Sequence, residues 1–168
     1  LNALNTSQFS VLSTVQVKAL STEQINNLES ADIAALGTTG IRALASDQIA
    51  ALSTEGIQSI STQQAASLTS TQAAGLSTEQ ISVIATDDLR ALSSAALRSL
   101  TSEQFTGFDS AQLSVLTSAQ VRSLTTAQLS TLTSDSLNAF GTAQFAALSS
   151  AQLRALSTDQ LSTLESAD

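Results

Sequence analysis

The stretch Leu76-Ser77-Thr78-Glu79-Gln80-Ile81-Ser82-Val83 is one copy of a unit that fills the whole chain. Leucine or a close substitute returns at its first position every eighth residue, without an insertion, from Leu4 to Leu164. We number the eight positions from zero at this residue, so that position five holds the second apolar residue, here Ile81. A strict short period indicates one small structural unit stacked many times. The sequence therefore predicts a single tandem array over residues 1–168, with about 21 octapeptide repeats.

The other positions of the octad are almost as narrow in composition. All five phenylalanines lie at position zero or five, as core residues would. Position two is Ser or Thr in every unit, position one is mostly Ser or Thr, and position four is usually Gln. Every basic residue lies at position six, and the acidic residues lie only at positions one, three and four. Charge is thus sorted along the octad together with hydropathy.

Three backbone conformations compete to explain this pattern. A single long helix fails because each residue turns by about 100°, so the apolar stripe would slip by about 80° in every repeat. A β-solenoid fits poorly, because positions zero and five differ by an odd number and would face opposite sides of a strand. From position five to the next position zero is a spacing of three, which is one face of a helix. The sequence favours a very short helix and a corner in each octad.

Each octad also carries a signal for the start of a helix. Ser21-Thr22-Glu23-Gln24 has the form of a capping box, with Ser at the N-cap and Gln at N3, where Gln closes the cap. A second register places the N-cap at position two, the only position that never loses its hydroxyl; Ala45 and Ala85 break position one. We favour position two as the usual cap and keep position one as the alternative. In either register the acids lie near the helix start and the bases near its end, as the helix dipole favours.

The predicted fold is all-α: an α-solenoid, or superhelix, of very short helices, one per octad, with a β-solenoid as the alternative. A helix this short does not survive alone, because nucleation costs more than one turn repays. Its stability must therefore come from stacking on its neighbours. Neither the number of octads per superhelical turn nor the handedness follows from the sequence. Both ends fall in mid-pattern, so we expect a fragment of a longer array.

Composition argues against several functional classes. The net charge of −8 disfavours nucleic acid as a partner, because phosphates need a basic surface. Runs of about 18 apolar residues are absent, which predicts no membrane insertion. The chain contains no histidine, cysteine, tyrosine or tryptophan, so the usual general base for a serine nucleophile is missing. We expect no enzymatic activity, no catalytic or metal site and no cofactor.

The unit Leu-Ser-Thr-x-Gln-Ile/Val/Leu-x-x, as in Leu20 to Asn27 or Leu156 to Thr163, resembles octapeptide arrays of long bacterial surface proteins. Those proteins are of the adhesin-like or haem-utilisation-like type, and the resemblance spans the whole chain. It implies a secreted or surface-displayed stalk, with binding activity in neighbouring domains of the parent protein.

Two functional hypotheses follow. The first is a structural spacer. The alternative is a binding solenoid that holds a peptide or a glycan along the Gln and position-six columns, with Arg90, Arg98 and Arg122 lining one surface. In addition, the open ends of a solenoid carry no polar cap, which predicts end-to-end self-association.

Overall fold

The computed structural model describes residues 5–162 and residue 164. Twenty short α-helices, and no strand, occur in this part of the chain. Each of these helices comes from one octad, so the all-α prediction is confirmed and the β-solenoid alternative is wrong. Leu4, the first residue of the period, lies outside the described residues.

The helices stack in three columns, because each packs against the helices three places before and after it. The first column contains α1 (Thr6–Phe9), α4 (Ser30–Ala35), α7 (Thr54–Gln58), α10 (Thr78–Ser82), α13 (Ser102–Phe105), α16 (Thr126–Ser130) and α19 (Ser150–Arg154). The second contains α2 (Thr14–Lys18), α5 (Gly37–Ala43), α8 (Thr62–Ser67), α11 (Thr86–Ala91), α14 (Ser110–Ser114), α17 (Ser134–Asn138) and α20 (Thr158–Ser162). The third contains α3 (Thr22–Asn26), α6 (Ser46–Ala50), α9 (Ser70–Ala73), α12 (Ser94–Ser99), α15 (Ser118–Ser123) and α18 (Thr142–Phe145).

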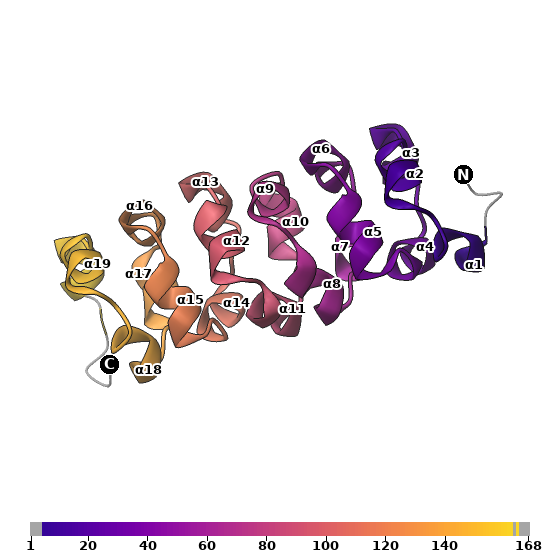
Figure 1. Ribbon diagram of the computed structural model, residues 1–168. Helices are drawn as coiled ribbons and strands as arrows, with labels where there is room; N and C mark the ends of the chain where they lie inside the picture. Colours follow the sequence, from indigo (N-terminus) through magenta and orange to yellow (C-terminus); the bar gives the residue numbers. More distant parts are fainter. Residues whose placement is uncertain (1–4, 163, 165–168) are drawn as a thin grey trace.

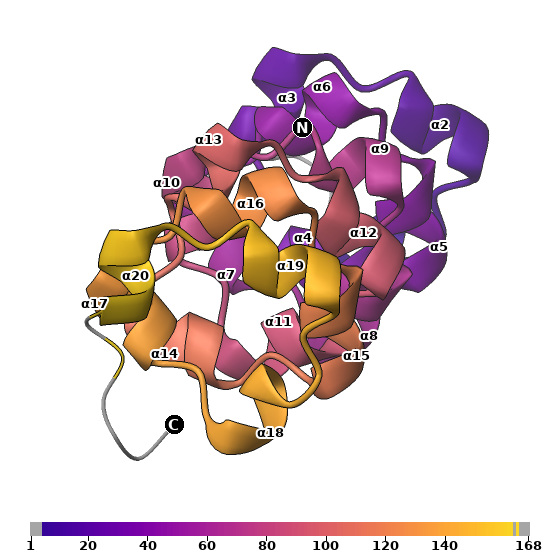
Figure 2. The same ribbon diagram turned by 90° about the vertical axis from the view of Figure 1, so that its left-hand side faces the viewer.

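Three octads of eight residues, 24 in all, therefore complete one superhelical turn. Figure 1 shows the result as an elongated array that runs from α1 at one end to α19 at the other. From the C-terminal end (Figure 2), the chain passes from α14 at the lower left to α15 at the lower right, then α16 above and α17 at the left. It moves counter-clockwise while approaching the viewer, so the superhelix is right-handed.

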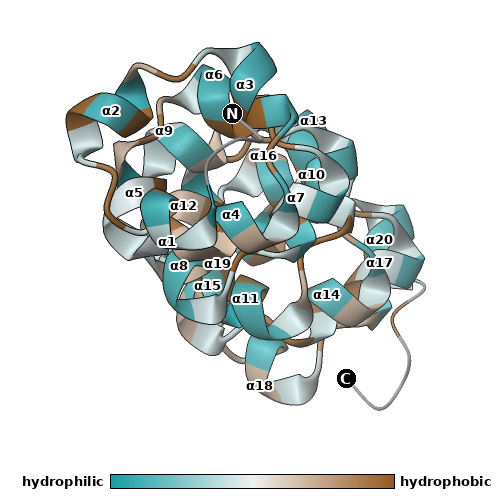
Figure 3. Ribbon diagram, turned by 90° about the vertical axis from the view of Figure 1, so that its right-hand side faces the viewer, coloured by the Kyte–Doolittle hydropathy of each residue, from teal (hydrophilic) through white to brown (hydrophobic). Residues whose placement is uncertain are grey.

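Positions zero and five form one hydrophobic cluster along the array, as the sequence predicts. Inside the array the position-five side chains are almost fully buried; Ile81, Leu97 and Phe105, for example, have no exposed surface. Phe105 and Phe108 pack edge to face, with ring centroids 4.9 Å apart. Figure 3, viewed from the N-terminal end, shows hydrophilic residues on α3, α10 and α20 and hydrophobic residues on α2. Val15 of α2 is 75% exposed.

The N-cap lies at position one, so our preference for position two is wrong. At α15, the Thr117 side chain accepts a hydrogen bond from the Gln120 amide N–H, and the Gln120 side chain accepts one from the Thr117 N–H. Position two is already helical and occupies N1. Where position one is Ala45, the hydroxyl is absent but Gln48 Oε1 still accepts from the Ala45 N–H at 2.8 Å. Half of the capping box therefore suffices to keep the register.

One helix departs from this pattern. α5 begins at Gly37, directly after Leu36, which caps both it and the preceding α4. Gly37 has a φ of 60°, in the left-handed region that glycine adopts without the steric cost of a Cβ. The glycine allows the chain to pass from α4 into α5 without the usual extended residue at position one.

The capping register predicts different effects of two neighbouring substitutions. Thr125→Ala removes the hydroxyl that accepts from the Gln128 N–H and should lower the free energy of unfolding by about 1 kcal/mol. Thr126→Ala, one residue further on at the exposed N1 position, should change it by less than about 0.5 kcal/mol. Urea unfolding followed by far-UV circular dichroism measures both. A larger loss for Thr126→Ala would contradict the assigned register.

Candidate functional site

The most regular polar arrangement in the array is built by the glutamines of position four. Gln120 Oε1 accepts a hydrogen bond from the Thr117 N–H at 2.8 Å, within its own octad. Its Nε2 donates to the carbonyls of Leu89 and Leu92, each at 2.9 Å. These carbonyls lie where α11 ends, before α12, the helix on which α15 stacks. One amide thus closes the cap of its own helix and bonds to the preceding superhelical turn.

The same bridge recurs along the array. In each case Nε2 donates to the carbonyl 31 residues earlier, and in nearly all cases also to the one 28 residues earlier. We call these residues the clamp glutamines: Gln48, Gln64, Gln72, Gln80, Gln104, Gln112, Gln120, Gln128, Gln144, Gln152 and Gln160. All are buried.

The interpretation that Gln closes the cap is confirmed, but the bond to the preceding turn was not foreseen. Because the clamp amides are buried and already bonded, they are not free to hold a peptide or glycan. Among the described residues, the position-four glutamines of the first turn are exposed instead of buried: Gln8, Gln16 and Gln24. The Gln column of the binding-solenoid hypothesis is therefore part of the scaffold, and the position-six column is the part that remains accessible.

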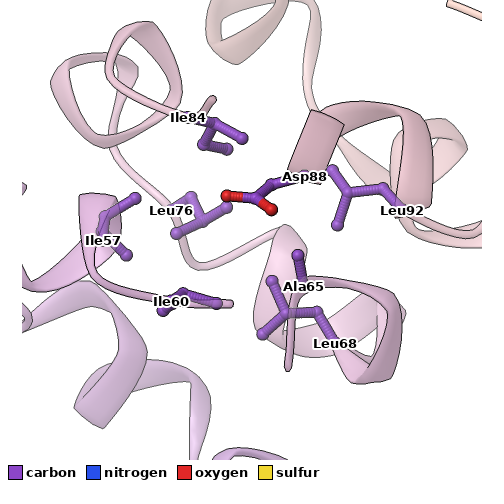
Figure 4. Close-up of a pocket in the computed structure, with 8 residues that line it drawn as sticks. All are labelled: Ile57, Ile60, Ala65, Leu68, Leu76, Ile84, Asp88 and Leu92. Carbon is purple, nitrogen blue, oxygen red and sulfur yellow. The ribbon is translucent and has the colours of Figure 1, made fainter. Parts of the chain in front are cut away.

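A cavity of about 20 Å³ lies at one of the octads that have no clamp glutamine (Figure 4). Asp88 replaces Gln at position four of α11 and is 8% exposed. Thr62 Oγ1 of α8 donates to Asp88 Oδ1 at 2.7 Å, so that a hydroxyl–carboxylate bond joins these two stacked helices. Ala65, a small residue at position five, leaves space beneath it. The remaining lining is apolar: Ile57, Ile60, Leu68, Leu76, Ile84 and Leu92.

This cavity has the size of a site for one water molecule and is too small for an organic substrate. Asp88 is its single charged side chain, and the cavity brings together no base, nucleophile and oxyanion donor. Within the described ranges, no group of three or more histidine, cysteine, aspartate or glutamate residues could hold a metal ion. We therefore interpret the cavity as a packing defect at a substituted clamp position.

The three arginines singled out from the sequence lie on two columns. Arg98 of α12 and Arg122 of α15 lie on stacked helices of the third column and line one shallow hollow of about 370 Å³. Arg90 belongs to α11 in the second column and does not line that hollow. The structure thus brings Arg98 and Arg122 together and places Arg90 apart from them.

Two acidic residues near helix starts have perturbed titration. The pKa of Glu55 and that of Glu79 are lowered, mainly by hydrogen bonds from the backbone of their own residues and then by nearby Ser and Thr hydroxyls. A lowered pKa in the folded state stabilises the fold at pH values above the ordinary Glu range. That contribution is lost as the pH falls through the lowered pKa. Both carboxylates are fully exposed, so their role is local.

A family model for the ALTTAQ repeat matches residues 1–29, 25–62, 81–118, 107–142 and 137–168. The chain belongs to the ALTTAQ repeat family. Read as one-letter amino-acid codes, the name ALTTAQ corresponds to position seven followed by positions zero to four of the octad. A near copy in this chain is Ser123-Leu124-Thr125-Thr126-Ala127-Gln128. The ALTTAQ motif therefore contains the core leucine, the N-cap hydroxyl, the N1 residue and the clamp glutamine. A search of curated proteins finds no match to the chain.

As a separate finding, none of the described helices of the ALTTAQ repeat array is long and apolar enough to cross a membrane.

The clamp of the ALTTAQ repeat array predicts a large difference between two glutamines. Gln120→Ala leaves the Thr117 N–H and the Leu92 carbonyl without their partners and should cost about 2–4 kcal/mol of unfolding free energy, since a buried unsatisfied group costs roughly 1–3 kcal/mol. Gln24→Ala is the matched control: Gln24 closes its cap but is exposed and has no preceding turn to bond, so about 1 kcal/mol or less is expected. Equal losses in urea unfolding would show that the bond between turns contributes nothing.

Restoring the missing clamp should stabilise the ALTTAQ repeat array. Asp88→Gln removes a buried carboxylate, fills part of the cavity and places an amide donor near the carbonyls of Ile57 and Ile60, which lie 31 and 28 residues earlier. We expect a gain of about 1 kcal/mol, the typical net value of a hydrogen bond. Asp87→Asn is the control, since it removes a neighbouring exposed charge without reaching the cavity. A lower thermal midpoint for Asp88→Gln than for Asp87→Asn would refute this explanation of the cavity.

Proposed function

We propose that this ALTTAQ repeat array is a non-enzymatic structural segment that acts as a spacer or stalk in a large secreted or surface-displayed bacterial protein. The observation that supports it most is the regular contact pattern. Apart from α4 with the adjoining α5, the contacting helices lie three octads apart, and the clamp bonds recur with the 31-residue offset and, in nearly all cases, the 28-residue offset. A segment of this kind gains length in proportion to the number of octads, because each turn contacts only its neighbours.

The absence of a chemical centre in the described residues leaves this mechanical role as the best match to the geometry. The hydroxyls of position one act as caps where they occur, and the amides of position four act as clamps, as Thr117 and Gln120 illustrate. Secretion or surface display, and the presence of neighbouring domains that do the binding, are proposed from the resemblance to octapeptide arrays of bacterial surface proteins.

We extend the proposal to end-to-end self-association of arrays. On the first turn, Val11 and Val15 are 78% and 75% exposed, and on the last turns Leu153 and Leu161 are 43% and 47% exposed. In the preceding turns position five is almost fully buried by a following turn, so Leu153 and Leu161 present the surface on which another turn would stack. Val15→Glu together with Leu161→Glu should abolish any concentration-dependent association in analytical ultracentrifugation. Association that persists in this variant would contradict a contact through the array ends.

A tandem fusion tests the spacer role directly. Because 168 residues divided by 24 per turn gives seven turns, two copies joined without a linker keep the superhelical register. We expect the maximum dimension in small-angle scattering to double, with the cross-section unchanged. The control is the same fusion with four extra residues at the junction, which breaks the octad register and should introduce a bend. A double-length chain that folds into a more compact particle would overturn the proposal.

A further inference from the structure

Four of the six basic residues form two pairs separated by one superhelical turn. Arg98 and Arg122 are 24 residues apart, and so are Lys18 and Arg42. Because 24 residues make one turn, each pair lies on stacked helices: α12 with α15, and α2 with α5. Each pair lines a hollow of about 370 Å³. The same arrangement thus occurs twice, in different columns and at different heights.

The Arg98–Arg122 hollow is free of acidic groups. Its lining consists of the two arginines, the hydroxyl residues Ser123, Thr125, Thr126 and Ser149, and Leu124, Ala151 and Gln152. The octads that contribute α9, α12, α15 and α18 contain no aspartate or glutamate, and neither do those of α16 and α19. In a chain with a net charge of −8, this region is therefore locally basic.

Among the described residues, the two guanidinium groups also have no partner. Neither Arg98 nor Arg122 makes a side-chain hydrogen bond or an ion pair within the part of the chain that the structure describes. The Thr126 hydroxyl is free of hydrogen bonds there as well. Two like charges that face one hollow repel each other unless an anion lies between them. Guanidinium groups bind carboxylate, sulfate and phosphate through paired N–H···O bonds.

We propose that the Arg98–Arg122 hollow binds an acidic sugar, with the carboxylate or sulfate of the ligand between the two guanidinium groups. The hydroxyls of Thr126 and Ser149 would then exchange hydrogen bonds with the hydroxyl groups of the sugar. The volume of about 370 Å³ lies in the range of small-ligand pockets, which begin at about 300 Å³. A nucleic acid fits less well, because the remaining surface of the chain is acidic.

The Lys18–Arg42 hollow is a second site of the same kind, with Thr14 and Thr39 in the place of the other hydroxyls. It should bind more weakly, because a lysine ammonium is a point charge and does not form the paired bonds of a guanidinium. Arg90 and Arg154 line neither hollow and have no place in this proposal. The charged part of this site is independent of the spacer role, since Arg98 and Arg122 are exposed and belong to neither the clamp nor the core.

Titration of the full chain with defined probes, at one fixed ionic strength, tests the proposal. The probes are a sulfated heparin disaccharide, a galacturonic acid trisaccharide, inorganic phosphate and neutral maltotriose. Isothermal calorimetry gives the affinity, and the Nε–Hε NMR signals of Arg98 and Arg122 report where the ligand binds. We expect saturable binding of at least one acidic sugar, with these two signals shifted first. Which of the two acidic sugars binds identifies the anion.

Three double variants, each of which removes two positive charges, provide the test and its two controls. Arg98→Gln with Arg122→Gln should weaken the binding of the acidic sugar by about tenfold or more, as expected for lost bonds to a charged group. Arg90→Gln with Arg154→Gln removes the same charge outside the hollows and should change the affinity by less than about twofold. Lys18→Gln with Arg42→Gln should remove only a second, weaker binding step. Equal weakening in all three variants, binding of phosphate or maltotriose as tight as that of the acidic sugars, or no saturable binding of either sugar would overturn the proposal.

Discussion

The glutamine of position four is the residue on which the architecture depends. Its amide oxygen accepts from the N-cap N–H three residues earlier, and its amide nitrogen reaches carbonyls 28 and 31 residues earlier, as Gln120 shows. The first bond belongs to the secondary structure, and the second joins one superhelical turn to the next. A single buried side chain therefore couples the start of a helix to the stacking of turns. A buried amide oxygen or amide nitrogen without a hydrogen-bond partner would lower the free energy of unfolding.

This coupling explains why such short helices are stable in this chain. A helix of four to seven residues ends before its own hydrogen bonds repay its nucleation. In the array, carbonyls at the end of one helix, which would otherwise be left without donors, accept from the clamp of the next turn. The core supplies the remainder, because position five of each octad inside the array is covered by the turn above it. At Asp88, where position four has no clamp glutamine and Ala65 is small, a cavity lies in the core.

Most of the local structure was predictable from the octad. Positions zero and five of the core, the helix in every octad and the charge order along each helix all follow from spacing and capping chemistry. The position of the N-cap was not predictable, because Ser or Thr occurs at both position one and position two, and either could cap the helix. Hydrogen bonds such as those between Thr117 and Gln120 distinguish the two positions. The candidate site was predictable in part: Arg98 and Arg122 share a hollow, whereas Arg90 lies in another column and Lys18 with Arg42 was overlooked.

The sequence by itself determined that each octad forms one short amphipathic helix, since hydropathy, capping residues and helix dipole act over distances of a few residues. The tertiary structure alone decided that three octads make a turn, that the superhelix is right-handed and that residues 24 apart become neighbours. These properties depend on contacts between residues of successive turns, which are 28 and 31 positions apart in the chain. An example is the Gln80 amide, which donates to the carbonyls of Ile49 and Leu52. An eight-residue period contains no information on that packing, because every octad presents nearly the same pattern to every other.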